Sequence, residues 1–503
     1  MQKKRIFSAI LAALMLASFV SCSNGGNNAE TDGETNAETE VVAEAQTETE
    51  VETEAEITMN SLRSLYSDRD YSGYEFRIAD RGGSGDWITF DVYSEEMNGE
   101  TINDAVYSRN TLMEELLNIK IVENRLDSPS STVKTSITAG SDDVDTVTDG
   151  IDSLCSLSTN GLILDYRTVS TIKLENEWWD QAMYKNLSVL NHNYVMTGDI
   201  SIMDNYGTWC YLFNKDMITD LGLEDPYTLV NEGKWTLDKH NEMATAAMRD
   251  TDGDGAWTDA DTYGYITEDF NAIALWLSMG YRITDKDEND LPYFNYESEA
   301  SVSALINIVK TQQGDFTNMG SGSTVVQGGG VETPNGRERQ FAIGGALFYY
   351  AGMRNITLFR DSDVTFGIIP APKENEAQQE YYSSYSCSNL TAYSLPKTLS
   401  DANRTGDIME IMAHFSKYSL TPAYVEQTLI GKASRDEESE PMIYLILENR
   451  NYDLGSVFDW GGIRSAITNI KDPDTVASKL ASMKKIGNKV LEKYIASLEE
   501  SAE

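Results

Sequence analysis

The stretch "RDTDGDGAWTDADTYGY" places five Asp residues within twelve positions, around a Gly-Asp-Gly core. Aligned with a twelve-residue calcium loop, Asp250, Asp252 and Asp254 take positions 1, 3 and 5, and the carbonyl of Ala256 takes position 7. Position 12 is Asp261, where such loops normally have a bidentate Glu. Because Ca²⁺ takes six to eight oxygen ligands, this loop could supply most of a calcium site. A solvated turn and a catalytic acid cluster are the alternatives.

Sequence motifs for the commoner catalytic mechanisms do not occur. His192, His240 and His414 are scattered and form no HExxH pair, which excludes a zincin and argues against a His-based triad. The sequence also has no GxSxG and no Walker A motif. A glycosidase needs only two positioned carboxyl groups, and the chain has 81 Asp and Glu residues. A secreted glycosidase therefore stays open as an alternative function.

The first residues, "MQKKRIFSAILAALMLASFVSC", have a basic start and an apolar core shorter than the roughly 20 residues of a membrane span. This pattern predicts a secretory signal peptide over residues 1–21. A Cys directly after the apolar core, followed by a polar tract, resembles a bacterial lipoprotein signal, which implies lipidation of Cys22. Residues 19–21 lack the Leu that usually stands three places before such a Cys. The alternative is ordinary secretion with an incidental Cys.

Composition separates a polar N-terminal segment from a globular remainder. Residues 23–58 contain no Lys or Arg and almost no large apolar residues, so we expect residues 22–60 to form a disordered acidic tether. The 503-residue chain has a formal charge of −42 and no basic patch, which excludes nucleic-acid binding. Cys155, Cys210 and Cys387 are widely spaced. We expect them to be small buried side chains, with one disulfide as the alternative.

Strand and helix patterns alternate from about residue 71. "YEFRIAD" alternates apolar residues like a strand, "INDAVYSRNTLMEELLN" has helical spacing, and "IKIVENRL" is a second strand. After a predicted helix, "STVKTSITAG", a third strand lies in "DDVDTVTDG". This order predicts a parallel sheet with crossover helices. The chain ends in a predicted amphipathic helix with one apolar stripe, made of Leu480, Met483, Ile486, Val490, Tyr494 and Leu498.

A series of segments follows in a characteristic order: "ITAGSDDVDTVTDG", "LCSLSTNGLILDY", "TWCYLFNKDMITDLGL", "GKWTLDKHNEMATAAM", "RQFAIGGALFYYAGM", "VTFGIIPAPK" and "VFDWGGIRSAI". Together they resemble the extracellular solute-binding proteins of ABC importers, in the carbohydrate-binding group related to maltose-binding protein. The resemblance implies an α/β fold of the type II periplasmic-binding-protein kind, with a ligand cleft between two lobes joined by crossing strands. Lobe one would hold residues 66–198 and about 380–432. Lobe two would hold residues 199–379 and about 433–503.

A sugar site combines aromatic platforms with carboxylates or amides that bind hydroxyl groups, and the chain has 27 Tyr and 8 Trp. The predicted ligand-binding residues are Trp87, Asp149, Asp199, Asp204, Asn205, Tyr350, Asp459 and Trp460. Core packing is the alternative for the aromatic residues, and turn formation or helix capping is the alternative for the polar ones. The neighbouring pair Trp178 and Trp179 is expected to pack in the core.

The resemblance implies a monomeric, non-enzymatic protein anchored by lipidated Cys22 to the outer face of the cell membrane. It would capture a sugar or oligosaccharide by hinge closure and present itself to the permease subunits of an ABC transporter, with no required cofactor. In the resembled family an Asp-Gly-Asp-Gly turn is commonly a surface turn, so the calcium loop and the solvated turn both stay open. The alternative functions are a secreted glycosidase and a surface glycan-binding adhesin.

Overall fold

The computed structural model describes residues 61–82, 88–258, 260–268, 270–319, 336–360, 362, 364–433 and 436–502. The predicted signal peptide, Cys22 and the acidic tether lie outside the described residues. Within them the strands form a four-stranded sheet, a five-stranded sheet and a two-stranded hairpin. Among the described helices, none combines the length and apolar content that a membrane span requires. Cys155, Cys210 and Cys387 are buried free thiols, as expected from their spacing.

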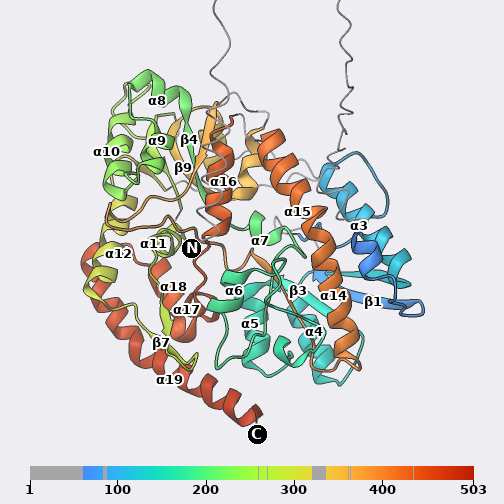
Figure 1. Cartoon of the computed structure of the whole chain (residues 1–503). Helices are drawn as coiled ribbons and strands as arrows, with labels where there is room; N and C mark the ends of the chain where they lie inside the picture. Colours follow the sequence, from blue (N-terminus) through green and yellow to red (C-terminus); the bar gives the residue numbers. More distant parts are fainter. Residues whose placement is uncertain are drawn as a thin grey trace, which may run out of the picture. The chain divides into compact units, whose positions relative to one another are not determined.

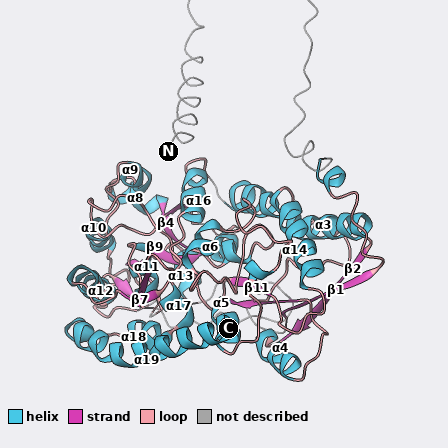
Figure 2. Cartoon of the chain, turned by 60° about the horizontal axis from the view of Figure 1, so that its bottom comes forward, coloured by secondary structure: helices cyan, strands magenta, loops and turns pink. Residues whose placement is uncertain are grey.

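The first sheet has the strand order β11-β3-β1-β2, formed by β1 (Tyr74–Arg81), β2 (Ile119–Leu126), β3 (Thr146–Gly150) and β11 (Thr391–Ser394). β1 is parallel to both β2 and β3, which confirms the predicted crossover pattern. β11 is antiparallel to β3 and comes from much later in the chain. The helices beside this sheet are α3 (Thr101–Leu117), α4 (Pro129–Thr138), α5 (Ile151–Thr159) and α14 (Ala402–Lys417), as Figures 1 and 2 show.

Local sequence explains the start and end of several helices. α3 buries Val106, Met113 and Leu117 along one face and ends at Asn118, whose positive φ of 50° lets its N–H bond back to the helix. In the second lobe, Thr236 accepts a hydrogen bond from the backbone N–H of Lys239 and so caps α10 (Leu237–Ala247). Thr is a favoured residue at this position, because its short side chain can accept from the first turn of the helix.

The second sheet has the strand order β10-β4-β9-β5-β8. Its strands are β4 (Trp209–Asn214), β5 (Tyr263–Ile266), β8 (Thr317–Asn318), β9 (Ala346–Gly352) and β10 (Phe366–Ile369). β4 lies antiparallel between β10 and β9, and its residues are all buried. The helices that accompany this part of the chain are α8 (Lys215–Leu221), α9 (Pro226–Asn231), α10, α11 (Asn271–Ser278), α12 (Glu299–Gln312), α13 (Arg337–Ala342) and α16 (Ser439–Glu448) (Figure 1).

Shorter elements complete the chain. The hairpin pairs β6 (Thr284–Lys286) with β7 (Pro292–Phe294). The remaining elements are η1 (Tyr166–Thr168), α6 (Gln181–Asn186), α7 (Met203–Tyr206), η2 (Met353–Phe359), α15 (Leu420–Pro422), the π-helix η3 (Ala423–Ala433), α17 (Leu454–Phe458), η4 (Trp460–Gly462), α18 (Ile463–Thr468), η5 (Pro473–Thr475) and α19 (Val476–Ala502). The strands of the first sheet fall in the ranges predicted for lobe one, and those of the second sheet fall in the range 199–379 predicted for lobe two.

Three segments run side by side between the two sheets, and we call residues 205–209, 383–387 and 449–453 the crossing segments. Backbone hydrogen bonds join them in pairs: the N–H of Trp209 donates to the carbonyl of Ser384 (2.9 Å), and that of Asn451 donates to the carbonyl of Ser383 (2.9 Å). Two isolated bridges, Thr208 with Tyr385 and Ser383 with Arg450, follow the same alignment. The described lobes are therefore connected by paired extended chain.

The terminal helix α19 contacts both lobes. Its N-terminal part, including Leu480, belongs to the core of the second lobe. Its C-terminal part packs on the first lobe, where the hydroxyl of Tyr494 lies 2.9 Å from that of Ser158 on α5. The stripe predicted for this helix is wrong in its middle, because Ile486 and Val490 are 55% and 40% exposed. A helix of 27 residues is about 40 Å long and bridges the gap between two cores.

The pair Trp178 and Trp179 packs in the first lobe, as expected. Trp179 is 1% exposed, and both indole N–H groups donate to the carboxylate of Glu410, at 3.1 Å from Trp178 and 2.8 Å from Trp179. The ring of Trp178 also stacks on His414, with centroids 3.9 Å apart. The tryptophan pair therefore anchors α14 to the loop before α6.

Two acidic residues lie near each other on the first sheet: Asp80 on β1 is buried, and Glu123 on β2 is partly buried. Asp80 is 0% exposed, and neither of its carboxylate oxygens has a hydrogen-bond donor. The nearest cation is Arg125, whose Nε is 3.8 Å from both carboxylates. Burial, followed by the charge of Glu123, raises the pKa of Asp80 to about 8. Asp80 therefore keeps its proton in the folded protein at neutral pH.

This raised pKa predicts a pH dependence of stability. The unfolded chain releases the Asp80 proton near pH 4 and the folded chain near pH 8, so the free energy of unfolding should fall as the pH rises through that window. Asp80→Asn should make this slope less negative by up to about 1.4 kcal/mol per pH unit. Urea unfolding at pH 4.5, 6 and 7.5 measures the slope. The exposed Asp68→Asn is the control, and equal slopes for both variants would contradict the prediction.

Candidate functional site

A cavity of about 350 Å³, which we call the main cavity because it is the more enclosed of the two described here, lies where the end of the second sheet meets the chain that leads into β11. Trp209 begins β4 and pairs with Gly352, the last residue of β9, so adjacent strand ends form its floor. Its wall toward the first lobe is residues 386–389. The lining residues are Gly207, Trp209, Glu268, Phe270, Arg337, Glu338, Tyr349, Gly352, Arg354, Asn355, Ser386, Ser388 and Asn389.

Trp209 is the largest aromatic side chain of the main cavity. It is 8% exposed, and its ring lies 6.1 Å from that of Phe270 and 5.4 Å from that of Tyr350, measured between centroids. Its indole N–H is buried and has no hydrogen-bond partner among the described residues. A buried donor without a partner costs about 1–3 kcal/mol, so a bound ligand that accepts this hydrogen bond would recover the loss.

Charged groups surround this aromatic pair. Arg337 forms an ion pair with Glu268 at 2.9 Å. Glu338 is 4% exposed and accepts hydrogen bonds from the hydroxyl of Tyr349 (3.2 Å) and the side-chain amide of Asn355 (3.4 Å). Burial raises the pKa of the Tyr349 hydroxyl well above its ordinary value, so this group remains a donor. Carboxylates, amides and guanidinium groups beside an aromatic surface are able to bind the hydroxyls and the apolar face of a sugar ring.

A second, more open cavity, of about 540 Å³, shares the lining residues Ser388 and Asn389 with the main cavity. It is lined by Arg81, Asp152, Ser153, Ser156, Ser388, Asn389, Val457, Phe458, Asp459 and Arg464. The predicted residue Asp459 is therefore at a cavity. Its backbone has a φ of 47°, and its carboxylate accepts a hydrogen bond from the backbone N–H of Ser465 at 3.3 Å.

Asp149 lies at the end of β3, as predicted, and is 4% exposed. Its carboxylate accepts hydrogen bonds from Nε of Arg81 (3.0 Å) and from the hydroxyl of Ser130 (2.7 Å). Arg81 in turn reaches the second cavity. Asp149 thus supports a cavity-lining side chain in this conformation.

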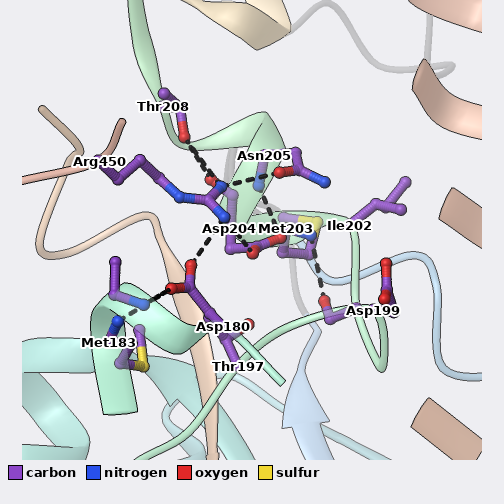
Figure 3. A network of polar contacts seen from close by, with 12 residues as sticks. Asp180, Met183, Thr197, Asp199, Ile202, Met203, Asp204, Asn205, Thr208 and Arg450 are labelled. Carbon is purple, nitrogen blue, oxygen red and sulfur yellow. Dashed lines mark hydrogen bonds and ion pairs between the residues drawn. The ribbon is translucent and has the colours of Figure 1, made fainter. Parts of the chain in front are cut away.

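Asp204 and Asn205 contact Arg450 at the crossing segments, whereas Asp199 lies apart from Arg450 (Figure 3). Nη2 of Arg450 is 3.2 Å from the carboxylate of Asp204, and Nη1 donates to the side-chain oxygen of Asn205 at 2.8 Å. Asp199 accepts a hydrogen bond from the hydroxyl of Thr421 at 2.7 Å. Burial is the main cause that raises the pKa of Asp204 to about 7 and that of Asp199 to about 6. At least one side-chain oxygen of each of these three residues is therefore bonded within the protein.

The predicted aromatic residues lie behind the cavities. Tyr350 is 1% exposed and bonds through its hydroxyl to Ser384 at 2.9 Å, which places it behind Trp209. Trp460 is 3% exposed and stacks on Phe458 with centroids 4.7 Å apart. In this conformation the ring that reaches the second cavity is Phe458. Trp87 lies outside the described residues.

The aspartate loop lies apart from both cavities. The carboxylates of Asp250, Asp252 and Asp254 are exposed and lie within 4.8 Å of one another. Asp261 is not part of this group: it is 2% exposed, and its carboxylate accepts backbone hydrogen bonds from Thr251 and Thr258, each at 2.8 Å. These bonds lower the pKa of Asp261 and close the loop.

Calcium binding by this loop stays a prediction. If the three carboxylates hold Ca²⁺, calcium should raise the midpoint of thermal unfolding by mass action, and a chelator should lower it. Asp252→Asn removes one charged ligand and should shrink the shift, whereas Asp238→Asn, on α10, should leave it unchanged. An identical midpoint with calcium and with chelator would identify the loop as a solvated turn.

The main-cavity residues Trp209, Glu268, Phe270 and Arg337 were not predicted from the sequence as ligand-binding residues. Trp209 does stand in the segment "TWCYLFNKDMITDLGL", where a Trp opens an otherwise buried strand. The sequence feature that could have identified Trp209 as a ligand-binding residue is an aromatic residue at the end of a strand. Glu268, Phe270 and Arg337 come from segments without a recognisable pattern, and only the folded chain brings them to Trp209.

The chain is similar to known proteins in structure but not in sequence. No protein-family profile matches the chain, and no curated protein matches it in sequence. Among solved structures, it is similar to a cyclo/maltodextrin-binding protein complexed with maltotetraose, with a TM-score of 0.52, 13% identity, and coverage of 84% of this chain and 96% of that one. A sugar transporter from Rhizobium etli in an open conformation also has a TM-score of 0.52 and 13% identity, covering 84% and 99%.

RafE from Streptococcus pneumoniae, in its apo form, is similar with a TM-score of 0.50 and 13% identity, covering 82% of this chain and 97% of that one. At such identities the likeness establishes the fold. The matches span nearly the full length of these neighbours. The described chain therefore has the two-lobed α/β fold of the type II periplasmic binding proteins.

Proposed function

We propose that this protein is the substrate-binding component of an ABC importer and captures a sugar or oligosaccharide in the main cavity. The observation that carries the proposal is Trp209, a buried aromatic whose indole N–H has no described partner, beside the ion pair of Arg337 and Glu268. The solved structures with this fold include a maltodextrin-binding protein and a sugar transporter. Closure of the lobes about the crossing segments would enclose the ligand.

We further propose that Cys22 carries the lipid anchor and that the protein works without chemical change to its ligand at the outer face of the membrane. The closed form would present both lobes to the permease subunits. Mass spectrometry of the N-terminal peptide tests the anchor: a diacylated Cys22 is expected. A secreted chain cleaved elsewhere, with an unmodified Cys22, would contradict it.

Binding is tested by titration calorimetry of the purified protein with mono- and oligosaccharides, followed by chemical analysis of the recovered sugar. Trp209→Ala should weaken binding about 10- to 100-fold, because it removes both the aromatic face and the donor. Trp209→Phe keeps the apolar face and should lose about tenfold. Trp257→Ala, at a tryptophan that is 46% exposed, is the matched control.

Three outcomes would overturn the proposal. Failure of every sugar to bind would remove the carbohydrate assignment, and recovery of a cleaved sugar would favour the glycosidase alternative. Sugar bound intact but no stimulation of transport with any permease of the same cell would favour the adhesin. Each variant's thermal midpoint is measured alongside, so that a loss of folding is not read as a loss of binding.

A further inference from the structure

The terminal helix α19 carries a local charge opposite to that of the chain as a whole. From Val476 to Leu491 it contains four Lys residues and neither Asp nor Glu, in a chain whose formal charge is −42. The sequence itself shows no basic patch there, because these lysines are interspersed with apolar and small residues. The packing of the helix decides whether its lysines share one face.

The orientation of α19 places three lysines in one row. Leu491 and Leu498 are each 5% exposed and face the protein. Lys485, Lys489 and Lys493 are exposed and four positions apart, so they lie on the opposite side of the helix, with a rise of about 6 Å between neighbours. These three lysines make no ion pair with any other described residue. Their charges are therefore available to an external anion.

Two apolar side chains border the lysine row. Ile486 and Val490, one helical turn apart, are 55% and 40% exposed. Single exposed apolar residues are common on proteins, but these two are adjacent to each other and to three unpaired lysines. Figures 1 and 2 show α19 along an outer edge of the described chain. We call Lys485, Ile486, Lys489, Val490 and Lys493 the basic face of α19.

This combination of side chains suits a lipid surface. Helices that lie on membranes use lysines to bind anionic headgroups and apolar side chains to enter the boundary between headgroups and acyl chains. A soluble anion would contact the lysines alone and leave Ile486 and Val490 in water. Glu492 lies on the helix beside the row, so the local charge is three lysines against one glutamate. Carboxylates farther away than about 8 Å are largely screened at physiological ionic strength.

We propose that the basic face of α19 is a docking surface for a membrane that contains anionic lipids. The inference goes beyond sugar capture, and it rests on the proposed function only for the lipid anchor that would hold the domain beside the bilayer. Anchoring raises the effective concentration of the membrane, so that a weak contact is enough to orient the domain. Because α19 is packed on the cores of both lobes, this contact turns one defined side of the domain toward the lipid.

Cosedimentation of the unlipidated mature chain, residues 23–503, with lipid vesicles tests the surface without the anchor. Vesicles of phosphatidylcholine with about 40 mol% phosphatidylglycerol should bind the protein at least tenfold more tightly than pure phosphatidylcholine, because each lysine near an anionic surface contributes about fivefold in affinity. An increase in salt from about 20 to about 300 mM should remove most of this preference. The affinity for sugar is measured on the same preparations.

The combined variant Lys485→Gln, Lys489→Gln and Lys493→Gln should weaken binding to the anionic vesicles at least tenfold. Gln is a good helix former, so α19 should stay folded, and the affinity for sugar should be unchanged. The control variant removes the same charge from three other helices, α4, α6 and α12, and should change vesicle binding less than twofold. Its substitutions, at exposed lysines, are Lys134→Gln, Lys185→Gln and Lys310→Gln.

The double variant Ile486→Gln and Val490→Gln keeps every charge and should weaken vesicle binding about threefold to tenfold. Absence of binding to the anionic vesicles, or equal losses for the two lysine variants, would overturn the inference. A wild-type dimer in sedimentation velocity that the α19 lysine variant dissociates would assign the face to a second copy and overturn it as well. A protein that binds the anionic vesicles but no sugar would overturn the proposed function and leave this inference standing.

Discussion

Replacement of Arg450 by Met is expected to lower the free energy of unfolding by about 3–5 kcal/mol. Arg450 is 9% exposed, and its Nη2 lies 2.7 Å from Asp180 and 3.2 Å from Asp204. Its Nη1 also bonds to Asn205 on another crossing segment. The variant leaves two buried carboxylates without their cation, a change that costs far more than the loss of an exposed ion pair.

Urea unfolding at pH 8 measures this loss. Arg63→Met, at an exposed arginine that is paired with Glu115, is the control and should change the free energy by less than about 1 kcal/mol. The deficit of Arg450→Met should shrink at pH 5.5. Burial raises the pKa of Asp204 to about 7 with Arg450 present, so removal of the cation moves it higher and Asp204 is neutral at pH 5.5. A deficit below 1 kcal/mol, or one independent of pH, would contradict this account.

The second large effect is expected at Asp453, where replacement by Ala should lower the free energy of unfolding by about 3–5 kcal/mol. Asp453 is 1% exposed. Its carboxylate caps α17 through the backbone N–H groups of Gly455 (3.2 Å) and Ser456 (2.8 Å). It also accepts from the N–H (2.9 Å) and hydroxyl (2.8 Å) of Thr284, and from the N–H of Ile283 (3.1 Å). The variant leaves these donors buried and unpaired.

Asp225→Ala is the matched control, because Asp225 caps α9 at the surface and its loss should cost about 1 kcal/mol. Asp453→Asn keeps the shape of the side chain and one acceptor oxygen. Its loss in the free energy of unfolding should therefore lie between the losses of Asp453→Ala and Asp225→Ala. Equal losses for Asp453→Ala and Asp225→Ala in urea unfolding would show that the buried network adds nothing to the cap.

Sequence patterns predicted the fold well where they reflect burial of one face. The alternation in β1 and the helical spacing in α3 indicated a parallel sheet, and β1, β2 and β3 form one. The same reasoning failed in the middle of α19, where Ile486 and Val490 are exposed. The helix passes between two cores there, and periodicity records only that a residue is apolar, not that a partner faces it.

The site was harder to predict, because it depends on which side chain of a local pair faces outward. Trp460 and Phe458 are two residues apart, and the left-handed conformation of Asp459 between them turns Phe458 toward the second cavity and Trp460 inward. Asp149 lies at the strand end that was predicted, but its carboxylate is taken by Arg81. Hydrogen-bond partners from distant parts of the chain decide such cases, and no local pattern contains them.

The antiparallel pairing of β11 with β3 has a consequence for folding. Gly150 pairs with Thr391, so the first sheet is completed only after the whole second sheet has been synthesised. Until then β3 has an open edge that can pair with other chains. Contacts so distant in sequence slow folding, because a long loop must close before the pairing forms. A chain that stops before residue 391 should accordingly aggregate rather than yield an isolated first lobe.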